Sequence, residues 1–375
     1  MKWGTAPVKK ALFDAQSIIA AVTDNTPVKL TVAEQTLVGR ITGGNIDDLS
    51  VAQGQTLLSV LERPSFTYLG LSGPTLAGYA IQNINMTLYF DGGSAEFTVG
   101  ETITATSGGT GVVHSWEATG AWGSGTATGK LYLTGATEVI ADFADNDTLT
   151  GSVTGVATQK GALTTSNNAL LYTIGSGEDY ETYAAAADDL KSLILEANLA
   201  LQLAADTETS VGAVFDGLFS VGGRLILDLN DHTYELSSGA PSRMFTFQSP
   251  VYVDIRDYSG TPTGKVKMST ASTSPAYTMF HVNSPYCVLR LVDTLTMEMT
   301  EAYSEFAYLI SGQLIWVNPT VTLSGSGAVT QTVKMVFGAI GSALAANPTS
   351  LSFASGAIWV DKDGKVYTAA GLVGP

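Results

Sequence analysis

The sequence predicts a mainly β protein, with a small antiparallel β domain followed by a short right-handed parallel β-helix. An N-terminal helix and a linking amphipathic helix complete this fold class. Charged residues form only 14% of the 375 residues, while glycine contributes 40, a balance typical of short strands joined by tight turns. Apolar residues reach 45%, which supports an extensive core. Two regions, 89–165 and 211–375, also repeat themselves internally.

The first segment, residues 1–35, contains a run with helical periodicity. Its apolar positions follow i, i+3, i+4, i+7 spacing and predict an amphipathic helix of about four turns over residues 8–22. Such a helix is too short to be stable by itself and must pack on a partner. The apolar positions are Val8, Ala11, Leu12, Ala15, Ile18, Ile19 and Val22.

The second segment, residues 36–88, predicts a connector made of a strand, a Gly-Gly turn and a short helix. Ser50 and Gln53 have the spacing of a capping box, and Asp47 and Asp48 precede them. Acidic residues at this place favour a helix N-terminus.

The third segment, residues 89–165, predicts a small antiparallel β domain. Phe97–Thr104 recurs as Phe143–Thr150, and each copy is followed by a glycine-bearing turn and a short apolar strand. Apolar residues alternate with polar ones along the first copy, as a half-buried strand requires.

The fourth segment, residues 166–210, has few glycines and predicts the linking helix. Its apolar residues step by four and three, forming an a/d seam of about two and a half heptads. Two roles remain open for this helix: association around the axis of a trimer, or capping of the β structure that follows. The seam residues are Tyr183, Ala187, Leu190, Ile194, Ala197 and Leu201.

The last segment, residues 211–375, predicts the parallel β-helix. Met244–Asp257 and Met279–Asp293 share the pattern Met-Phe-x-apolar-amide-Ser-Pro, followed by an alternating strand and Asp. Repeats of about 25 to 35 residues are typical of solenoid coils, each of which is stable only when stacked on the next. Further parts of this segment are looser copies at Phe306–Val317 and from Met335, an entry strand at Gly223–Leu229 and a terminal hairpin at Ala357–Tyr367.

The connector also carries a family resemblance. The run from Leu37-Val38-Gly39-Arg40 to Gln53-Gly54-Gln55-Thr56-Leu57-Leu58 resembles a segment of bacteriophage tail fibres and related virion appendages. It departs from the usual form at Ser50, where threonine is common, and at Gly54, where alanine is common. The resemblance implies a homotrimeric virion protein whose first 35 residues attach it to other virion proteins, on the tail rather than the capsid. A capsid head fibre is the alternative placement.

A β-helix from a phage also raises the alternative of a polysaccharide-degrading tailspike, which uses two carboxylates. Asp257 and Asp293 hold equivalent places in the repeat and are expected to stack about 5 Å apart. Because turns between coils favour Asp for backbone reasons, we favour a turn role and predict no catalytic residue, cofactor or metal site. The candidate carboxylates are Asp228, Asp231, Asp254, Asp257, Asp293, Glu298, Glu301 and Glu305.

One candidate glycan-binding surface is aromatic. Trp116 and Trp122 flank a glycine-rich stretch, with His114 and Tyr132 nearby. Exposed aromatic rings stack on sugars, so these residues are candidates for contact with a host surface glycan. The alternative is that they anchor the loop to its own sheet or to a neighbouring subunit.

Charge and cysteine content exclude several other classes. A net charge of −16 repels nucleic acid, and no run approaches 18 apolar residues, so we expect no nucleic-acid partner and no membrane insertion. The single cysteine, Cys287, excludes an intrachain disulfide and is predicted to be a small buried hydrophobe. The N-terminus has no uninterrupted apolar run, so we expect no signal peptide.

Overall fold

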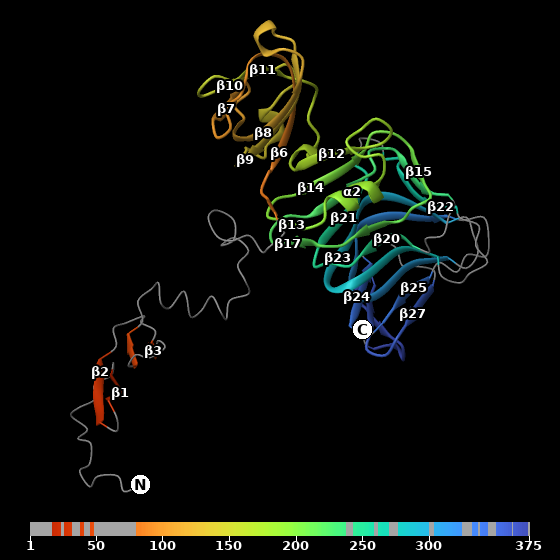
Figure 1. The fold of residues 1–375 in the computed structure, drawn as a ribbon. Coiled ribbons are helices and arrows are strands. Elements are labelled where there is room, and N and C mark those ends of the chain that lie inside the picture. Colours follow the sequence, from red (N-terminus) through yellow and green to blue (C-terminus); the bar gives the residue numbers. More distant parts are fainter. Residues whose placement is uncertain are drawn as a thin grey trace. The chain divides into compact units, whose positions relative to one another are not determined.

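The computed structural model describes the chain as two units, residues 1–73 and 74–375, and is mainly β as predicted (Figure 1). In the first unit it describes residues 17–23, 26–31, 38–40 and 46–48. In the second it describes 80–373, apart from 238–242, 259–261, 270–276, 300–303, 325–331, 337, 344–349 and 362.

The described part of the first unit consists of two antiparallel strand pairs. Strands β1 (Ser17–Thr23) and β2 (Thr26–Thr31) form one, and β3 (Val38–Arg40) and β4 (Ile46–Asp48) form the other.

The helix predicted over residues 8–22 is wrong for its last turns, because residues 17–22 belong to β1. The β-branched side chains of Ile18, Ile19 and Val22 favour a strand that finds a partner. Asp47 and Asp48 likewise lie in β4 rather than at a helix N-terminus. Residues 8–16 and the helix predicted after Ser50 lie outside the described residues.

The second unit begins with a closed antiparallel barrel of strand order β10-β11-β6-β9-β8-β7. Short 3-10 turns follow β8, β9 and β11, at η3 (Trp122–Ser124), η4 (Ile140–Asp142) and η5 (Thr165–Asn167). The barrel strands are β6 (Met86–Ala95), β7 (Thr102–Ala105), β8 (Thr110–Thr119), β9 (Ala127–Thr134), β10 (Thr148–Gly151) and β11 (Val156–Gln159).

The predicted internal repeat of the barrel folds into neighbouring strands. Strands β7 and β10 end the two copies and pair antiparallel, with Leu149 opposite Ala105. Ile103 and Leu149, at matching places in the two copies, are both fully buried. The barrel core therefore contains the same apolar positions from each copy.

A pair of carboxylates ties the two copies together. Glu101 accepts hydrogen bonds from the backbone N–H of Thr98 at 2.6 Å, in its own copy, and of Val153 at 2.9 Å, in the turn of the other. Asp147, at the matching position, accepts from Ala144 N–H at 2.8 Å and from the Ser107 hydroxyl at 2.9 Å. Each copy thus holds the turn of the other through a buried carboxylate.

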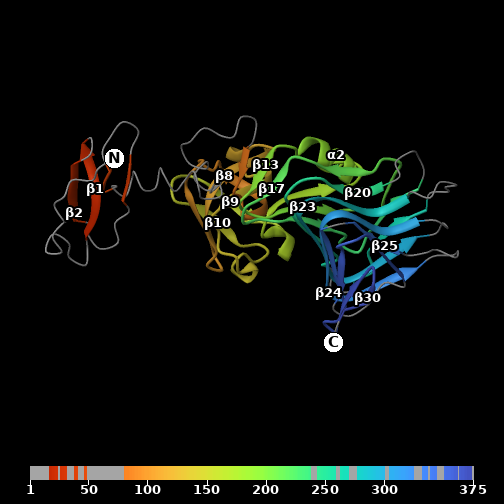
Figure 2. The same cartoon turned by 90° about the horizontal axis from the view of Figure 1, so that it is seen from below.

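The rest of the second unit is a β-solenoid whose strands pair in parallel, coil upon coil, along three faces (Figures 1 and 2). Face A contains β12 (Leu170–Ile174), β14 (Leu199–Leu203), β18 (Leu225–Asp228), β21 (Tyr252–Arg256), β26 (Ala339–Ala343) and β28 (Ile358–Val360). Face B contains β15 (Thr207–Thr209), β19 (Thr233–Leu236) and β22 (Lys265–Met268). Face C contains β16 (Ala213–Phe215), β20 (Arg243–Phe247), β25 (Thr332–Met335) and β27 (Ser350–Phe353).

Two long strands, β23 (Tyr277–Met299) and β24 (Ser304–Ser324), each run along all three faces in turn. Alongside the three faces, β5 (Ala80–Gln82), β13 (Leu193–Leu195) and β17 (Leu218–Ser220) form a small parallel sheet. At the C-terminal end, β29 (Val366–Thr368) and β30 (Gly371–Leu372) turn back antiparallel on β28.

The observed register confirms the repeat found in the sequence. Phe245 pairs with Phe280, 35 residues further on, and the two rings stack with centroids 5.8 Å apart. Val253 pairs with Leu289, 36 residues further on, across the inserted residue. All four side chains are buried, so each coil covers the apolar side chains of its neighbour.

The linking helix is shorter than predicted. Helix α2 comprises only Tyr183–Asp189, while Ile194 lies in β13 and Leu201 in β14, with Ala197 between these strands. Residues 193–195 pair with both β5 and β17, and this tertiary pairing outweighs the helical periodicity.

The apolar face of α2 is covered by the chain's own solenoid. Tyr183 is fully buried, and its ring lies 4.6 Å from that of Tyr234 and 5.8 Å from that of Phe245. Its hydroxyl donates to the Asp228 carbonyl at 3.2 Å, and Ala187 and Leu190 are buried as well. This packing favours the capping role over association around a trimer axis.

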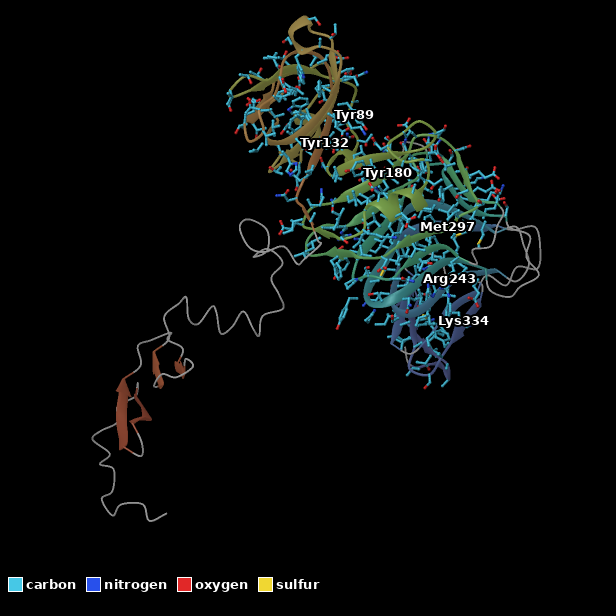
Figure 3. The ribbon with its side chains drawn as sticks, viewed as in Figure 1. Tyr89, Tyr132, Tyr180, Arg243, Met297 and Lys334 are labelled. Carbon is cyan, nitrogen blue, oxygen red and sulfur yellow. The ribbon has the colours of Figure 1, made fainter. Side chains whose placement is uncertain are left out.

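Barrel and solenoid share buried contacts. The Thr87 hydroxyl in β6 donates to the Ala169 carbonyl at 2.8 Å and accepts from the Leu171 N–H at 3.1 Å. The Asn167 side chain donates to the Thr87 carbonyl at 2.9 Å. Tyr89, labelled in Figure 3, packs on an apolar patch made of Ala169, Leu171, Ala200 and Ile226.

We expect the Glu101→Gln substitution to destabilise the barrel by about 1.5–3 kcal/mol at neutral pH, since it removes charge-assisted hydrogen bonds from a buried site. Burial alone would raise the pKa of Glu101, but backbone N–H groups of Thr98, Val153, Thr154 and Gly155 outweigh it and lower the pKa below 4.5. A pKa that is lower in the folded state stabilises the fold at pH values above the pKa of the unfolded state. This stabilisation is lost as the pH falls through the pKa of the folded state.

Urea unfolding of the variant and the parent protein from pH 7 to pH 3 measures this effect. The difference in free energy of unfolding should be largest at pH 7 and should shrink as the pH falls below 4.5, the ordinary pKa of this carboxyl group. Glu96→Gln, at an exposed position of the same module, is the control and should change little at any pH. A difference that does not depend on pH would contradict the assigned role.

Candidate functional site

The two tryptophans proposed as sugar-stacking residues pack onto the barrel. Trp122 stacks on Phe90 with ring centroids 5.2 Å apart, and Trp116 meets Trp122 edge to face at 5.5 Å. The Trp116 indole donates to the Phe97 carbonyl at 2.9 Å. Gly93 has no side chain, and a Cβ there would overlap the Trp122 ring. Both tryptophans are half-buried, an arrangement that favours the anchoring alternative.

His114 and Tyr132 do not join the tryptophans in one surface. His114 is exposed on β8, at an irregularity between Val113 and Ser115. Tyr132 in β9 is only 4% exposed and belongs to the core cluster of the solenoid, whereas its neighbour Leu131 belongs to that of the barrel. Figure 3 labels Tyr132 on the barrel. Burial is the main cause that raises the pKa of Tyr132.

The candidate carboxylates of the solenoid mainly accept hydrogen bonds that stabilise turns and join neighbouring coils. Asp257 is 2% exposed and accepts from Gly264 N–H at 2.6 Å and Asp231 N–H at 2.9 Å. Asp231 accepts from Thr263 N–H at 2.9 Å, on the following coil. The side chains of Asp293 and Glu301 lie outside the described residues, so stacking of Asp257 with Asp293 stays a prediction.

Asp228 anchors the segment that joins barrel and solenoid. Its fully buried carboxylate accepts from the Ser166 hydroxyl and from the Gln202 amide at 3.1 Å. Arg256 donates to the same Ser166 hydroxyl at 2.8 Å. This cluster fastens the linker onto face A.

A polar depression lies on face B of the solenoid, and we call it the polar groove. It has a volume of about 430 Å³. Four of its charged residues are in register, one from each of four successive coils: Glu208, Glu235, Lys267 and Glu298. Its lining residues are Asp206, Thr207, Glu208, Thr233, Glu235, Lys265, Lys267 and Glu298.

Ion pairs fix the charges of the polar groove. Lys267 lies 3.1 Å from Glu235, and Lys265 lies 3.6 Å from Glu298. Burial raises the pKa of Glu235, but hydrogen bonds from Ser269 and Lys267 outweigh it, so the pKa is lowered and the group is ionised at neutral pH. Glu235 therefore accepts hydrogen bonds, from Ser269 and Lys267, rather than donating a proton.

Of the groove, sequence reasoning singled out only Glu298. The available signal was the alternation of inward and outward side chains on face B. Tyr234, Val266 and Met297 point inward, so the residue on either side of each points outward. Finding it requires the register between coils, and the identical residues of the repeat do not extend to face B.

Two other reactive groups, Cys287 and His281, are buried in the solenoid. Cys287 is fully buried, as predicted, and burial raises the pKa of its thiol to about 12. His281 is 1% exposed, and burial together with the charge of Arg243 lowers its pKa to about 4. Within the described ranges, no group of three or more His, Cys, Asp or Glu side chains has the arrangement of a metal site, and no helix is long and apolar enough to cross a membrane.

Comparison with protein-family models, with curated proteins and with solved structures finds no match to this chain.

We expect Trp122→Ala to lower the free energy of unfolding by about 2–4 kcal/mol, because it removes a half-buried ring packed on three aromatic neighbours. Chemical denaturation measures the loss. His114→Ala, at an exposed position, is the control and should change stability by less than about 0.5 kcal/mol. Unchanged stability of the Trp122 variant would instead favour a binding role for this ring.

Proposed function

We propose that this chain is a structural virion protein, a component of a bacteriophage tail fibre or spike. In this role it mediates attachment to the host surface or carries a distal receptor-binding protein. Its N-terminal segment contacts other virion proteins, and the functional assembly is a homotrimer. The resemblance of residues 37–58 to such appendages is the starting point of the proposal.

The observation that carries the proposal is the unbroken parallel ladder from β12 to β28, joined to the barrel by buried hydrogen bonds. Its candidate carboxylates bind backbone N–H groups and neighbouring cations, as in Asp257 and Asp254. In a scaffold of stacked coils each coil is held by its neighbours. Such a scaffold is rigid and resists local opening, as an appendage requires.

The trimer is tested by static light scattering of the full-length chain. The monomer mass is 39.0 kDa, so a homotrimer is expected at three times that value, about 117 kDa. Because the apolar face of α2 is covered by its own chain, Tyr183→Phe should leave the mass unchanged. A parent protein of monomer mass would exclude the homotrimer.

Placement on the particle is tested by immuno-electron microscopy of purified phage that encodes the chain. Antibodies raised against the full-length protein should label the tail. Label on the capsid would replace the tail fibre with a head fibre, and protein that stays in the particle-free fraction would overturn the virion assignment. Incubation with host polysaccharide is the parallel assay, and shortening of the polymer would favour a depolymerase.

A further inference from the structure

A second, smaller cleft lies at the edge of face A, on a different face from the polar groove. It has a volume of about 150 Å³ and is formed where the chain enters β18, beside the first residue of β21. Pockets for drug-sized ligands usually measure about 300–1,000 Å³, so this cleft suits a single ring. Its lining residues are Val221, Gly222, Gly223, Arg224 and Tyr252.

The floor of the cleft is bare backbone. The N–H groups of Val221, Gly222 and Gly223 all converge on the Leu195 carbonyl, at 3.0, 3.2 and 3.0 Å, and so hold the turn against the preceding coil. A Cβ at Gly223 would overlap the carbonyl of Ala197. The turn therefore requires glycine there for close packing, and this leaves room above it.

An exposed aromatic ring forms one wall. Tyr252 is 47% exposed, although the residues that follow it in β21 are buried. Its backbone is fixed because its N–H donates to the Ser220 hydroxyl at 2.9 Å. An exposed tyrosine whose backbone is fixed presents an apolar ring face and a polar hydroxyl to a ligand.

A guanidinium lies beside this ring, because Arg224 and Tyr252 precede the paired residues Leu225 and Val253. Arg224 Nη1 lies 3.1 and 3.4 Å from the two carboxylate oxygens of Asp254, and Arg290 Nε approaches the same carboxylate from the next coil at 3.4 Å. Two guanidinium groups thus share one carboxylate.

Arg224 retains hydrogen-bonding capacity toward a ligand. Its side chain is 40% exposed, and its contacts with Asp254 come from Nη1. A guanidinium has five N–H donors, so Nε and Nη2 can form the two parallel hydrogen bonds that a carboxylate accepts.

We propose that this cleft binds a carboxylated sugar, a uronic or sialic acid residue of a glycan. Tyr252 stacks on the apolar face of the sugar ring, Arg224 holds its carboxylate, and the glycine turn leaves space for the ring. The proposal stands on these residues and does not depend on placement of the chain on a virion.

The test is isothermal titration of the full-length protein with three probes: methyl glucuronide, the methyl glycoside of N-acetylneuraminate and methyl glucoside. One of the two acidic probes should bind with a Kd of about 1 mM, as a single ring with few contacts allows, and the neutral glucoside should bind at least about tenfold more weakly. The acidic probe that binds more tightly identifies the source of the carboxylate.

Variants locate the binding. Arg224→Lys keeps the charge but loses the planar fork, and Tyr252→Ser loses the ring, so each should weaken binding by about tenfold or more. Tyr252→Phe should stay within about twofold of the parent protein. Tyr258→Ser, two residues beyond the end of β21 and similarly exposed at 43%, is the matched control and should bind normally.

Circular dichroism melting establishes that each variant is folded. Binding of neither acidic probe, equal binding of the neutral glucoside, or normal affinity in folded Arg224→Lys and Tyr252→Ser would each overturn the proposal. Loss of binding in Tyr258→Ser at unchanged affinity of the other variants would place the ligand elsewhere and overturn it as well.

Discussion

The second unit depends above all on apolar side chains stacking in register from coil to coil. One column on face A runs through Leu201, Leu227, Ile255, Leu291 and Trp316, each paired with the next and each at most 1% exposed. A single coil is only one strand thick, so it cannot bury these side chains without a neighbouring coil. The column therefore makes the coils interdependent. It also fixes which neighbouring positions point outward, and these are the positions that build the polar groove and the cleft beside Tyr252.

A stack of this kind has two open ends, and the chain closes them differently. Near its first coils, α2 places Tyr183 under Tyr234 and Phe245, and the barrel covers part of face A through Tyr89. At the other end the parallel ladder stops because β29 turns back antiparallel on β28. The helix and barrel at one end, and the antiparallel turn at the other, cover apolar surface or pair backbone groups that would otherwise need a further coil.

The sequence predicts the solenoid well where the repeat carries identical residues. The Met-Phe positions of the two best copies align as the structure pairs them, with Phe245 opposite Phe280, because the same inward positions recur in successive coils. Helical spacing was right for residues 183–189 but misleading over residues 190–201, since a spacing of three or four also arises where two short strands flank a turn. The polar groove was missed because Glu208 and Lys267 differ in charge and align only once the register is known. For the tryptophans, the sequence could not tell an exposed ring from one packed on Phe90.

The reciprocal carboxylates of the barrel give it an internal symmetry. Glu101 reaches Val153, and Asp147 reaches Ser107, so the partner outside each copy lies six residues beyond the matching carboxylate of the other copy. Contacts that exchange in this way between two equivalent elements are the signature of an isologous interface. The barrel therefore has the internal geometry of a symmetric dimer fused into one chain, in which neither half contains all the acceptors and donors that it needs. Glu101 and Asp147 hold the shared position of the two halves, so each half depends on the carboxylate of the other.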